Sequence, residues 1–154
     1  MKRLYITIML LAWIAIFGGC DQQNITEAEA SKEISIENLA DSWTMKKLEV
    51  TDQADPSSTT DLVSLGFAAG TVEIDSAGSY SAVFNVLGHE SKETGNVTIK
   101  QDSLIIHLDD SEGDKVYAVK LTDVLLTLSG EDSVDIDLDG VDEAVFAVMD
   151  LVRK

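Results

Sequence analysis

The sequence predicts an all-β domain, an eight-stranded antiparallel up-and-down barrel. Short segments with β-branched or aromatic residues at every second position recur from about residue 41 to the C-terminus. This period of two is typical of half-buried strands. All but one of the connections between the segments are short enough to join antiparallel neighbours. We expect closure into a barrel, because closure removes the exposed edges that a flat meander would leave.

The N-terminal segment has the order of an export signal. Two basic residues, Lys2 and Arg3, precede an apolar run over residues 4–17, and the run stops at Gly18 and Gly19. That order is typical of a cleaved signal peptide. The run is shorter than the roughly 20 residues that a transmembrane helix needs. We therefore predict a signal peptide over residues 1–19, with a plain secreted or membrane-retained protein as the alternative.

Cys20 follows this segment directly and is the only cysteine of the 154 residues. The residues Phe17-Gly18-Gly19-Cys20 resemble the lipobox of bacterial lipoproteins. The resemblance implies that the thiol of Cys20 is acylated, with palmitate among the acyl chains, and becomes the N-terminus of the mature protein. It also implies a lipid-anchored place in the bacterial cell envelope, with the membrane and the leaflet left open. A lone cysteine allows no internal disulfide, so the domain must be stabilised by its core.

The charge balance excludes one class of partner. Loss of residues 1–19 removes two basic side chains and leaves 28 acidic against 9 basic ones, a formal charge of −19. Such a chain repels nucleic acid and anionic headgroups. The acidity serves solubility in one interpretation and divalent-cation binding in the other. Residues 20–40 are polar with scattered isoleucines, and we expect a flexible lipidated tether there, with a short helix near its end.

Eight segments carry the strand pattern of the domain, which spans residues 41–154. They are Trp43–Thr51, Ala69–Asp75, Tyr80–Leu87, Glu93–Lys100, Ser103–Leu108, Lys115–Leu121, Val124–Leu128 and Ala144–Arg153. The apolar parity of the first segment changes near Lys46 and Lys47, which predicts a bulge. The longest break, residues 52–66, contains Pro56 and predicts at most a helical turn at Asp61–Leu65. A long acidic loop is expected before the last strand.

The chain from about Asn38 onward resembles the lipocalin-like domains of small bacterial lipoproteins, which are calycin-type barrels. The residues that carry the resemblance are Leu39-Ala40-Asp41-Ser42-Trp43, Asp75-Ser76-Ala77-Gly78-Ser79-Tyr80 and Asp150-Leu151-Val152-Arg153. The resemblance implies that Trp43 plugs one end of the barrel and that Arg153 lies over its ring. The alternative is a core tryptophan beside an unrelated terminal charge.

The resemblance also implies binding without catalysis. A barrel of eight strands is filled by its own side chains or holds one small ligand. The bulky inward candidates for a ligand-binding wall are Tyr80, Phe84, Tyr117 and Met149. We expect a non-enzymatic monomer that binds a small hydrophobic ligand. The alternative is a solid-cored barrel that acts as an envelope scaffold, inhibitor or protein-binding module.

One acidic stretch resembles an oxygen-ligated cation loop. Asp135, Asp137 and Asp139 occupy alternate positions before Gly140, and Glu143 follows. Alternate carboxylates can converge on one calcium ion, since glycine permits the sharp turn. The twelfth position is a phenylalanine, which excludes a standard EF-hand. The competing interpretation is a strand extension whose acidic side chains face water; no other cofactor is expected.

Overall fold

The computed structural model describes residues 31–111, 113–136 and 139–154. The predicted signal peptide, Cys20 and Asp137 lie outside these described residues. The ordered elements are one short helix and nine strands: α1 (Ile36–Leu39), β1 (Asp41–Asp52), β2 (Thr59–Asp61), β3 (Ala68–Ile74), β4 (Ser79–Val86), β5 (His89–Lys100), β6 (Ser103–Leu108), β7 (Asp114–Leu121), β8 (Leu125–Val134) and β9 (Glu143–Arg153).

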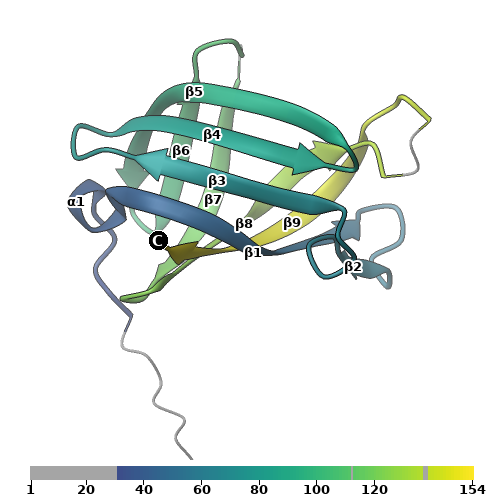
Figure 1. Cartoon of the computed structure of the whole chain (residues 1–154), viewed down its shortest axis with the longest axis horizontal. Coiled ribbons are helices and arrows are strands. Elements are labelled where there is room, and N and C mark those ends of the chain that lie inside the picture. The colour runs from purple at the N-terminus through teal and green to yellow at the C-terminus, as the bar shows by residue number, and fades with distance from the viewer. Residues whose placement is uncertain (1–30, 112, 137–138) are drawn as a thin grey trace, which may run out of the picture.

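Eight of the strands form a closed antiparallel barrel (Figure 1). Their order around the barrel is β1-β3-β4-β5-β6-β7-β8-β9, and β9 returns to pair with β1 from Trp43↔Arg153 to Asp52↔Val145. Every neighbouring pair is antiparallel. The predicted fold class is therefore confirmed. The register of the β1–β9 pair shifts between Met45 and Lys47, which confirms the predicted bulge.

The ninth strand, β2, was not predicted. It pairs with the end of β1 through Val50↔Thr60 and lies within the long break before β3. A strand of three residues is too short for a period of two to be recognised, and all three residues are polar or acidic. The barrel thus carries one small additional strand beside its closing seam.

Two predicted strand boundaries are wrong. β5 begins at His89, four residues before the predicted start, because Leu87 and Gly88 have φ values of 53° and 85° and form a tight two-residue turn. β8 extends to Val134, so the expected acidic loop is shorter by the residues that continue this strand. Both extensions consist mostly of polar residues, so the alternation of inward and outward positions produces no apolar pattern in the sequence. They lengthen the barrel at the same end.

The polar segment before Asp41 is packed against the barrel over its described part, although we expected residues 20–40 to form a tether. Ser35 caps α1 by accepting a hydrogen bond from the Asn38 amide. Leu39 is completely buried, and the Lys32 amide donates to the Leu121 carbonyl at 2.8 Å. The packed domain therefore begins about ten residues before the predicted boundary. Within the described ranges, no helix has the length and apolar character to cross a membrane.

The apolar core follows the inward positions of the strands. The helix α1 lies across one end of the barrel (Figure 1). The most deeply buried large side chains are Leu39, Trp43, Leu104, Leu121, Leu126 and Leu151. We call this end the closed end. The opposite end, with the β4–β5 turn and the β8–β9 loop, is called the open end.

Candidate ligand-binding cavity

The closed end is sealed by Trp43, whose side chain has no exposed surface. Its indole nitrogen donates a hydrogen bond to the Leu39 carbonyl at 2.9 Å. This bond joins the last residue of α1 to the beginning of β1. Burial of a tryptophan is compatible with its polar N–H only when that group has a partner. The tryptophan therefore fixes α1 across the barrel end as well as filling the interior.

Arg153 joins the same end from the last strand. Its Cζ lies 4.9 Å from the centroid of the Trp43 ring, and its Nη2 donates to the Asn38 carbonyl at 3.0 Å. Its Nε is 3.1 Å from Asp41 Oδ2, an ion pair without hydrogen-bond geometry. A guanidinium can stack on a ring and bind a carboxylate at the same time. The structure thus brings together the two residues that the resemblance assigned to barrel closure.

A cavity of about 400 Å³ occupies the barrel between this plug and the open end. Its volume lies in the range of small-molecule sites, roughly 300–1,000 Å³. Most of its wall is apolar, and the apolar lining consists of Met45, Leu48, Val50, Val72, Phe84, Val86, Leu87, Ile106, Leu128, Val134, Ala147 and Met149. The interior of the barrel is therefore not filled by its own side chains.

The four candidate wall residues all line this cavity. Tyr80 and Phe84 come from β4, Tyr117 from β7 and Met149 from β9, so the structure brings together side chains from three parts of the barrel. Tyr117 lies against Gly130 on β8, where a Cβ atom would come within 2.9 Å of the tyrosine ring. A larger residue at position 130 would displace the ring. The glycine thus sets the position of one wall of the cavity.

A polar network crosses one side of the cavity wall. Tyr80 donates its hydroxyl to Glu93 Oε2 at 3.2 Å, and Tyr117 donates to Asp132 Oδ2 at 2.7 Å. Lys115 connects the two pairs: its Nζ is 3.0 Å from Glu93 Oε1 and 3.7 Å from Asp132 Oδ1. Two carboxylates, one ammonium group and two phenols therefore form one connected group inside the barrel.

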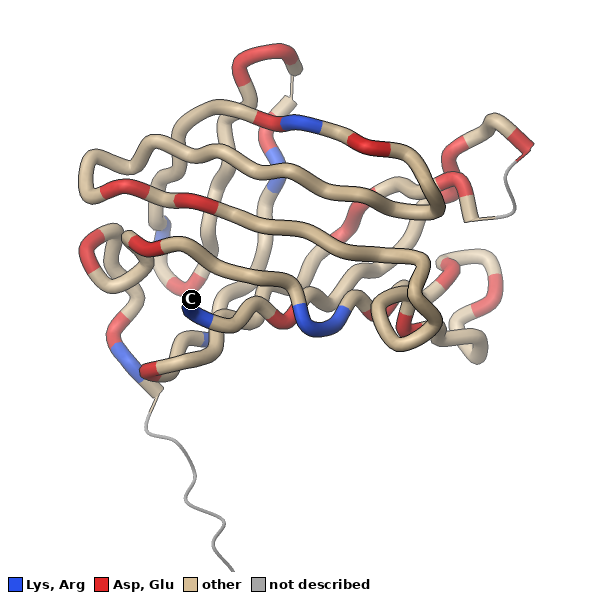
Figure 2. The backbone as a smooth tube through the Cα atoms, in the orientation of Figure 1, with Lys and Arg blue, Asp and Glu red and all other residues tan. Residues whose placement is uncertain are grey.

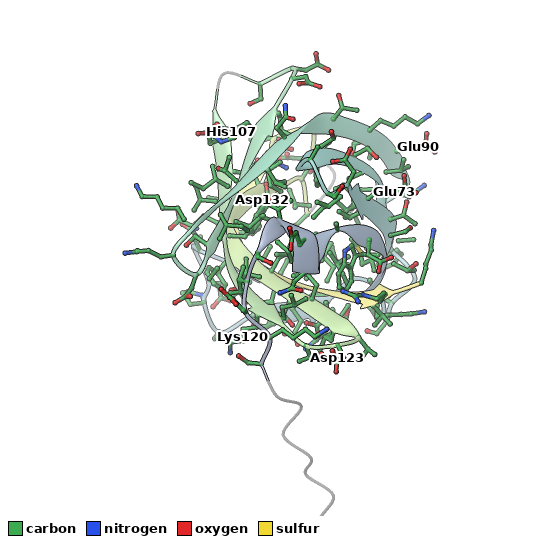
Figure 3. The ribbon with its side chains drawn as sticks, turned by 90° about the vertical axis from the view of Figure 1, so that its left-hand side faces the viewer. Glu73, Glu90, His107, Lys120, Asp123 and Asp132 are labelled. Carbon is green, nitrogen blue, oxygen red and sulfur yellow. The ribbon has the colours of Figure 1, made fainter. Side chains whose placement is uncertain are left out.

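Figure 3 looks onto the closed end and shows the contrast between inward and outward charges. Asp132 lies within the ring of strands, whereas the labelled Glu73, Glu90 and Lys120 lie at its outer rim. The side chains of Glu93 and Asp132 are 18% and 25% exposed, against 59% for Glu90. The inward acids are therefore partly removed from solvent while the outward ones are not.

Sequence reasoning missed Glu93, Lys115 and Asp132, although strand parity contained the signal. Glu93 shares the parity of Val97 on β5 and Lys115 that of Val119 on β7, so both are inward positions. Asp132 likewise follows Leu128 and Gly130 on the inward face of β8. A charged residue at an inward position of a strand is unusual unless it is paired. Such residues can be read directly from an alternating pattern.

The environment strongly favours the neutral form of both tyrosines. Burial raises the pKa of Tyr80, and the negative charge of Glu93 raises it further. Burial likewise raises the pKa of Tyr117, with Asp132 as the second cause. A phenol that donates to a carboxylate cannot ionise without creating a second negative charge beside the first. Both hydroxyls therefore remain donors to the carboxylates throughout the neutral pH range.

The acidic β8–β9 loop brings three of its four candidate ligands together. Carboxylate oxygens of Asp135, Asp139 and Glu143 lie within 4.8 Å of one another. Backbone amides already donate to two of these residues, from Asp139 and Gly140 to Asp135 and from Ile136 to Glu143. The strand extension is wrong for this stretch, since β8 ends at Val134. The calcium site stays a prediction.

The sequence matches no model of a known protein family and no curated protein. Function therefore has to be argued from the barrel, the plug and the cavity.

Proposed function

We propose that this chain is a lipid-anchored envelope protein whose lipocalin-like barrel binds a small, mainly hydrophobic ligand, without catalysing its conversion. One observation carries the proposal: the barrel holds an apolar-walled cavity of about 400 Å³ that is closed at one end by Trp43 and α1. An apolar cavity of this size is unfavourable when it is empty, because the atoms that line it lack dispersion contacts on one side. A ligand would supply those contacts.

The alternative of a solid-cored barrel predicts a filled interior and one contiguous exposed apolar patch. The interior contains a cavity instead. The strongly exposed large apolar side chains among the described residues come from β4, β7, β9 and several separate loops, namely Leu65, Phe67, Val83, Val116, Val124, Val141 and Phe146. Single exposed apolar residues are normal on a protein surface. Ligand binding is therefore the better supported of the two functions.

Binding of a neutral hydrophobic dye, N-phenyl-1-naphthylamine, tests the proposal. The dye should increase in fluorescence with the protein and saturate at one molecule per chain. The matched variants are Ala147→Phe and Ala118→Phe: Ala147 lines the cavity, whereas Ala118 faces outward on β7. The first substitution should abolish saturable binding because it fills the cavity, and the second should leave it intact.

Circular dichroism of both variants controls for folding. If Ala147→Phe fails to fold, Val86→Phe serves instead, because Val86 lines the cavity near the open end and is only half-buried. Equal dye binding by the wild type, the cavity variants and the outward variant would show that the dye binds elsewhere and would contradict the proposal. If the proposal holds, mass spectrometry of natively extracted protein should detect a co-purifying small hydrophobe.

The lipid anchor is tested separately. In the producing cell, the Cys20→Ser variant should move from the membrane pellet to the soluble fraction and lose the mass of its acyl chains. A single acyl chain gives only marginal membrane binding, so stable retention requires several chains. An unchanged membrane fraction for Cys20→Ser would mean that something other than this thiol holds the protein at the membrane.

A further inference from the structure

The cavity wall is divided into an apolar side and a polar side. The apolar side comes mainly from β1, β3 and β9 and contains Met45, Leu48, Val50, Val72, Ala147 and Met149. The other side comes from β4, β5, β7 and β8 and is mixed: apolar residues such as Phe84 and Leu128 accompany the polar ones. The polar residues are Tyr80, His89, Ser91, Glu93, Lys115, Tyr117, Asp132 and Ser133, and this side is called the polar side. A purely apolar ligand would leave the second side without a matching partner. The cavity therefore fits a molecule with one apolar part and one polar part.

The charge of the polar side is negative. Glu93 and Asp132 carry two carboxylates, and Lys115 carries the one ammonium group that faces them. This ammonium already contacts Glu93 at 3.0 Å. A ligand carboxylate would have to compete with Glu93 for the same cation and would lie beside two like charges, which is unfavourable at low exposure. An anionic headgroup is thus disfavoured on this side.

The hydrogen-bonding groups on the polar side also disfavour an anionic headgroup. The hydroxyls of both tyrosines are committed as donors to the carboxylates. Asp132 Oδ1 also accepts from the Ser133 amide at 2.9 Å. Each ionised carboxylate has about four lone-pair sites, and each phenol oxygen still has acceptor capacity. The two phenols and the two carboxylates therefore offer acceptors to a ligand, and the side-chain donors on the cavity wall are Lys115 and, nearer the open end, His89, Ser91 and Ser133.

The open end extends this negative field outward. Asp135 and Asp142 also line the cavity, from the β8–β9 loop. Figure 2 shows further acidic residues on the β6–β7 loop, where Asp109 and Asp110 are exposed, and Asp114 at the start of β7 is exposed as well. A cleft with walls of one sign raises the local concentration of ligands of the opposite sign. The approach to the cavity therefore favours cations.

We propose that the cavity selects a cationic amphiphile, with its apolar tail against the β1–β3–β9 side and its protonated amine or similar group beside the carboxylates of Glu93 and Asp132, whose two negative charges exceed the single positive charge of Lys115. This inference rests on the proposed ligand binding and names the chemical class of the ligand. The phenol rings of Tyr80 and Tyr117 add to the site, since aromatic faces attract cations.

Amphiphiles that share one tail and differ only in the headgroup test the inference. Dodecylamine, dodecanol and dodecanoate are titrated, below their micelle concentrations and at low salt, against protein loaded with N-phenyl-1-naphthylamine. Dodecylamine should displace the dye at concentrations lower than dodecanoate by about tenfold or more, with dodecanol between them. Added salt should narrow the difference, because salt screens the field at the open end.

Two acidic residues of β5 provide matched variants. Glu93→Gln removes an inward charge and Glu90→Gln an outward one on the same strand, so the net charge of the protein changes equally. Glu93→Gln and Asp132→Asn should each reduce the preference for dodecylamine over dodecanoate severalfold. Glu90→Gln should leave the preference unchanged.

The outcomes separate this inference from the proposed function. Displacement by dodecanol with no advantage for dodecylamine, or an advantage that survives both Glu93→Gln and Asp132→Asn, overturns the cationic headgroup and leaves ligand binding in place. Saturable binding of neither the dye nor any of the three amphiphiles overturns both. Loss of dodecanol displacement in Glu93→Gln would mean that this variant has lost its cavity. The preference of Asp132→Asn for dodecylamine over dodecanoate then tests the cationic headgroup.

Discussion

The two ends of the barrel contain similar charged groups but use them differently. At the closed end, Arg153 lies between the Asp41 carboxylate, the Asn38 carbonyl and the Trp43 ring. At the open end, Lys115 lies between the carboxylates of Glu93 and Asp132. The first group is packed against a completely buried tryptophan, and the second faces a cavity. The charged group at the closed end is packed against protein on all the sides described. The charged groups at the open end can still form hydrogen bonds to a molecule in the cavity.

This difference separates stability from function along the barrel axis. Buried apolar area supplies the main stabilising term in a domain without disulfides. Of the fully buried large side chains, Leu39, Trp43, Leu121, Leu126 and Leu151 come from the closed end, and Val145 is an exception toward the open end. Binding sites draw on the less completely packed parts of a structure. Substitutions at the closed end should therefore change unfolding more than binding, and those at the open end the reverse.

The largest expected effect is that of Trp43→Ala. The free energy of unfolding should fall by about 3–5 kcal/mol, the range for removal of a buried aromatic side chain, because the barrel end loses both its filling and the bond to Leu39. The free energy of unfolding of Trp43→Phe should lie between that of Trp43→Ala and that of the wild type. Urea unfolding, followed by circular dichroism, measures these values. A loss under 1 kcal/mol would contradict the role of Trp43 as the plug.

Alkaline pH should act on the open end. The pKa values of Tyr80 and Tyr117 are raised in the folded state, so the folded chain keeps protons that the unfolded chain releases. Their contribution to stability is complete below pH 10 and is lost as the pH rises above it, by about 1.4 kcal/mol per pH unit for each tyrosine. Urea midpoints between pH 9 and pH 11 measure the slope. Tyr80→Phe and Tyr117→Phe should each make it shallower; an unchanged slope in both would refute the assignment.

Substitution of two leucines of β8 allows the stability of the two ends to be compared within one strand. Leu126 has no exposed surface at the closed end, and Leu128 lines the cavity. Leu126→Ala should cost about 2–5 kcal/mol, and Leu128→Ala about 1 kcal/mol less, since Leu128 already lacks contacts on its cavity side. Denaturant unfolding of both variants gives the comparison. Equal losses would mean that the cavity is filled or collapsed in solution.

Arg153→Lys should have a smaller effect at the closed end. The ammonium keeps the charge near Asp41 but cannot stack flat on the ring, so we expect a loss of about 1 kcal/mol. Arg153→Met, which retains the apolar stem without the charge, should lose more. Thermal unfolding ranks the three proteins. The prediction fails if lysine and arginine give the same stability.

The smallest effect is expected from calcium at the β8–β9 loop. At a calcium concentration equal to a millimolar dissociation constant, the stabilisation would be about 0.4 kcal/mol. The melting temperature should rise with millimolar calcium, and the rise should disappear in a variant with Asp137 and Asp139 changed to Asn. The same rise in that variant, or none in the wild type, would leave the loop as a solvated acidic connection.

Alternation made the barrel predictable, whereas polar strand ends made its open rim unpredictable. Val72, Ile74 and Tyr80 mark inward faces because apolar residues recur at every second position. His89 and Ser91 also line the cavity, yet they lie outside the predicted strands because their segment is polar. The cavity itself depends on how side chains from nonadjacent strands meet, as for Phe84 and Met149, and no local pattern contains that information.

The placement of the aromatic residues allows the two ends to be observed separately. Beyond residue 20, Trp43 is the only tryptophan, and Tyr80 and Tyr117 are the only tyrosines. In a chain that starts at residue 20, intrinsic tryptophan emission therefore reports on the closed end alone, and phenolate absorbance reports on the cavity wall alone. In one unlabelled sample, loosening of the open end before the plug would show as tyrosine ionisation that precedes the tryptophan red shift.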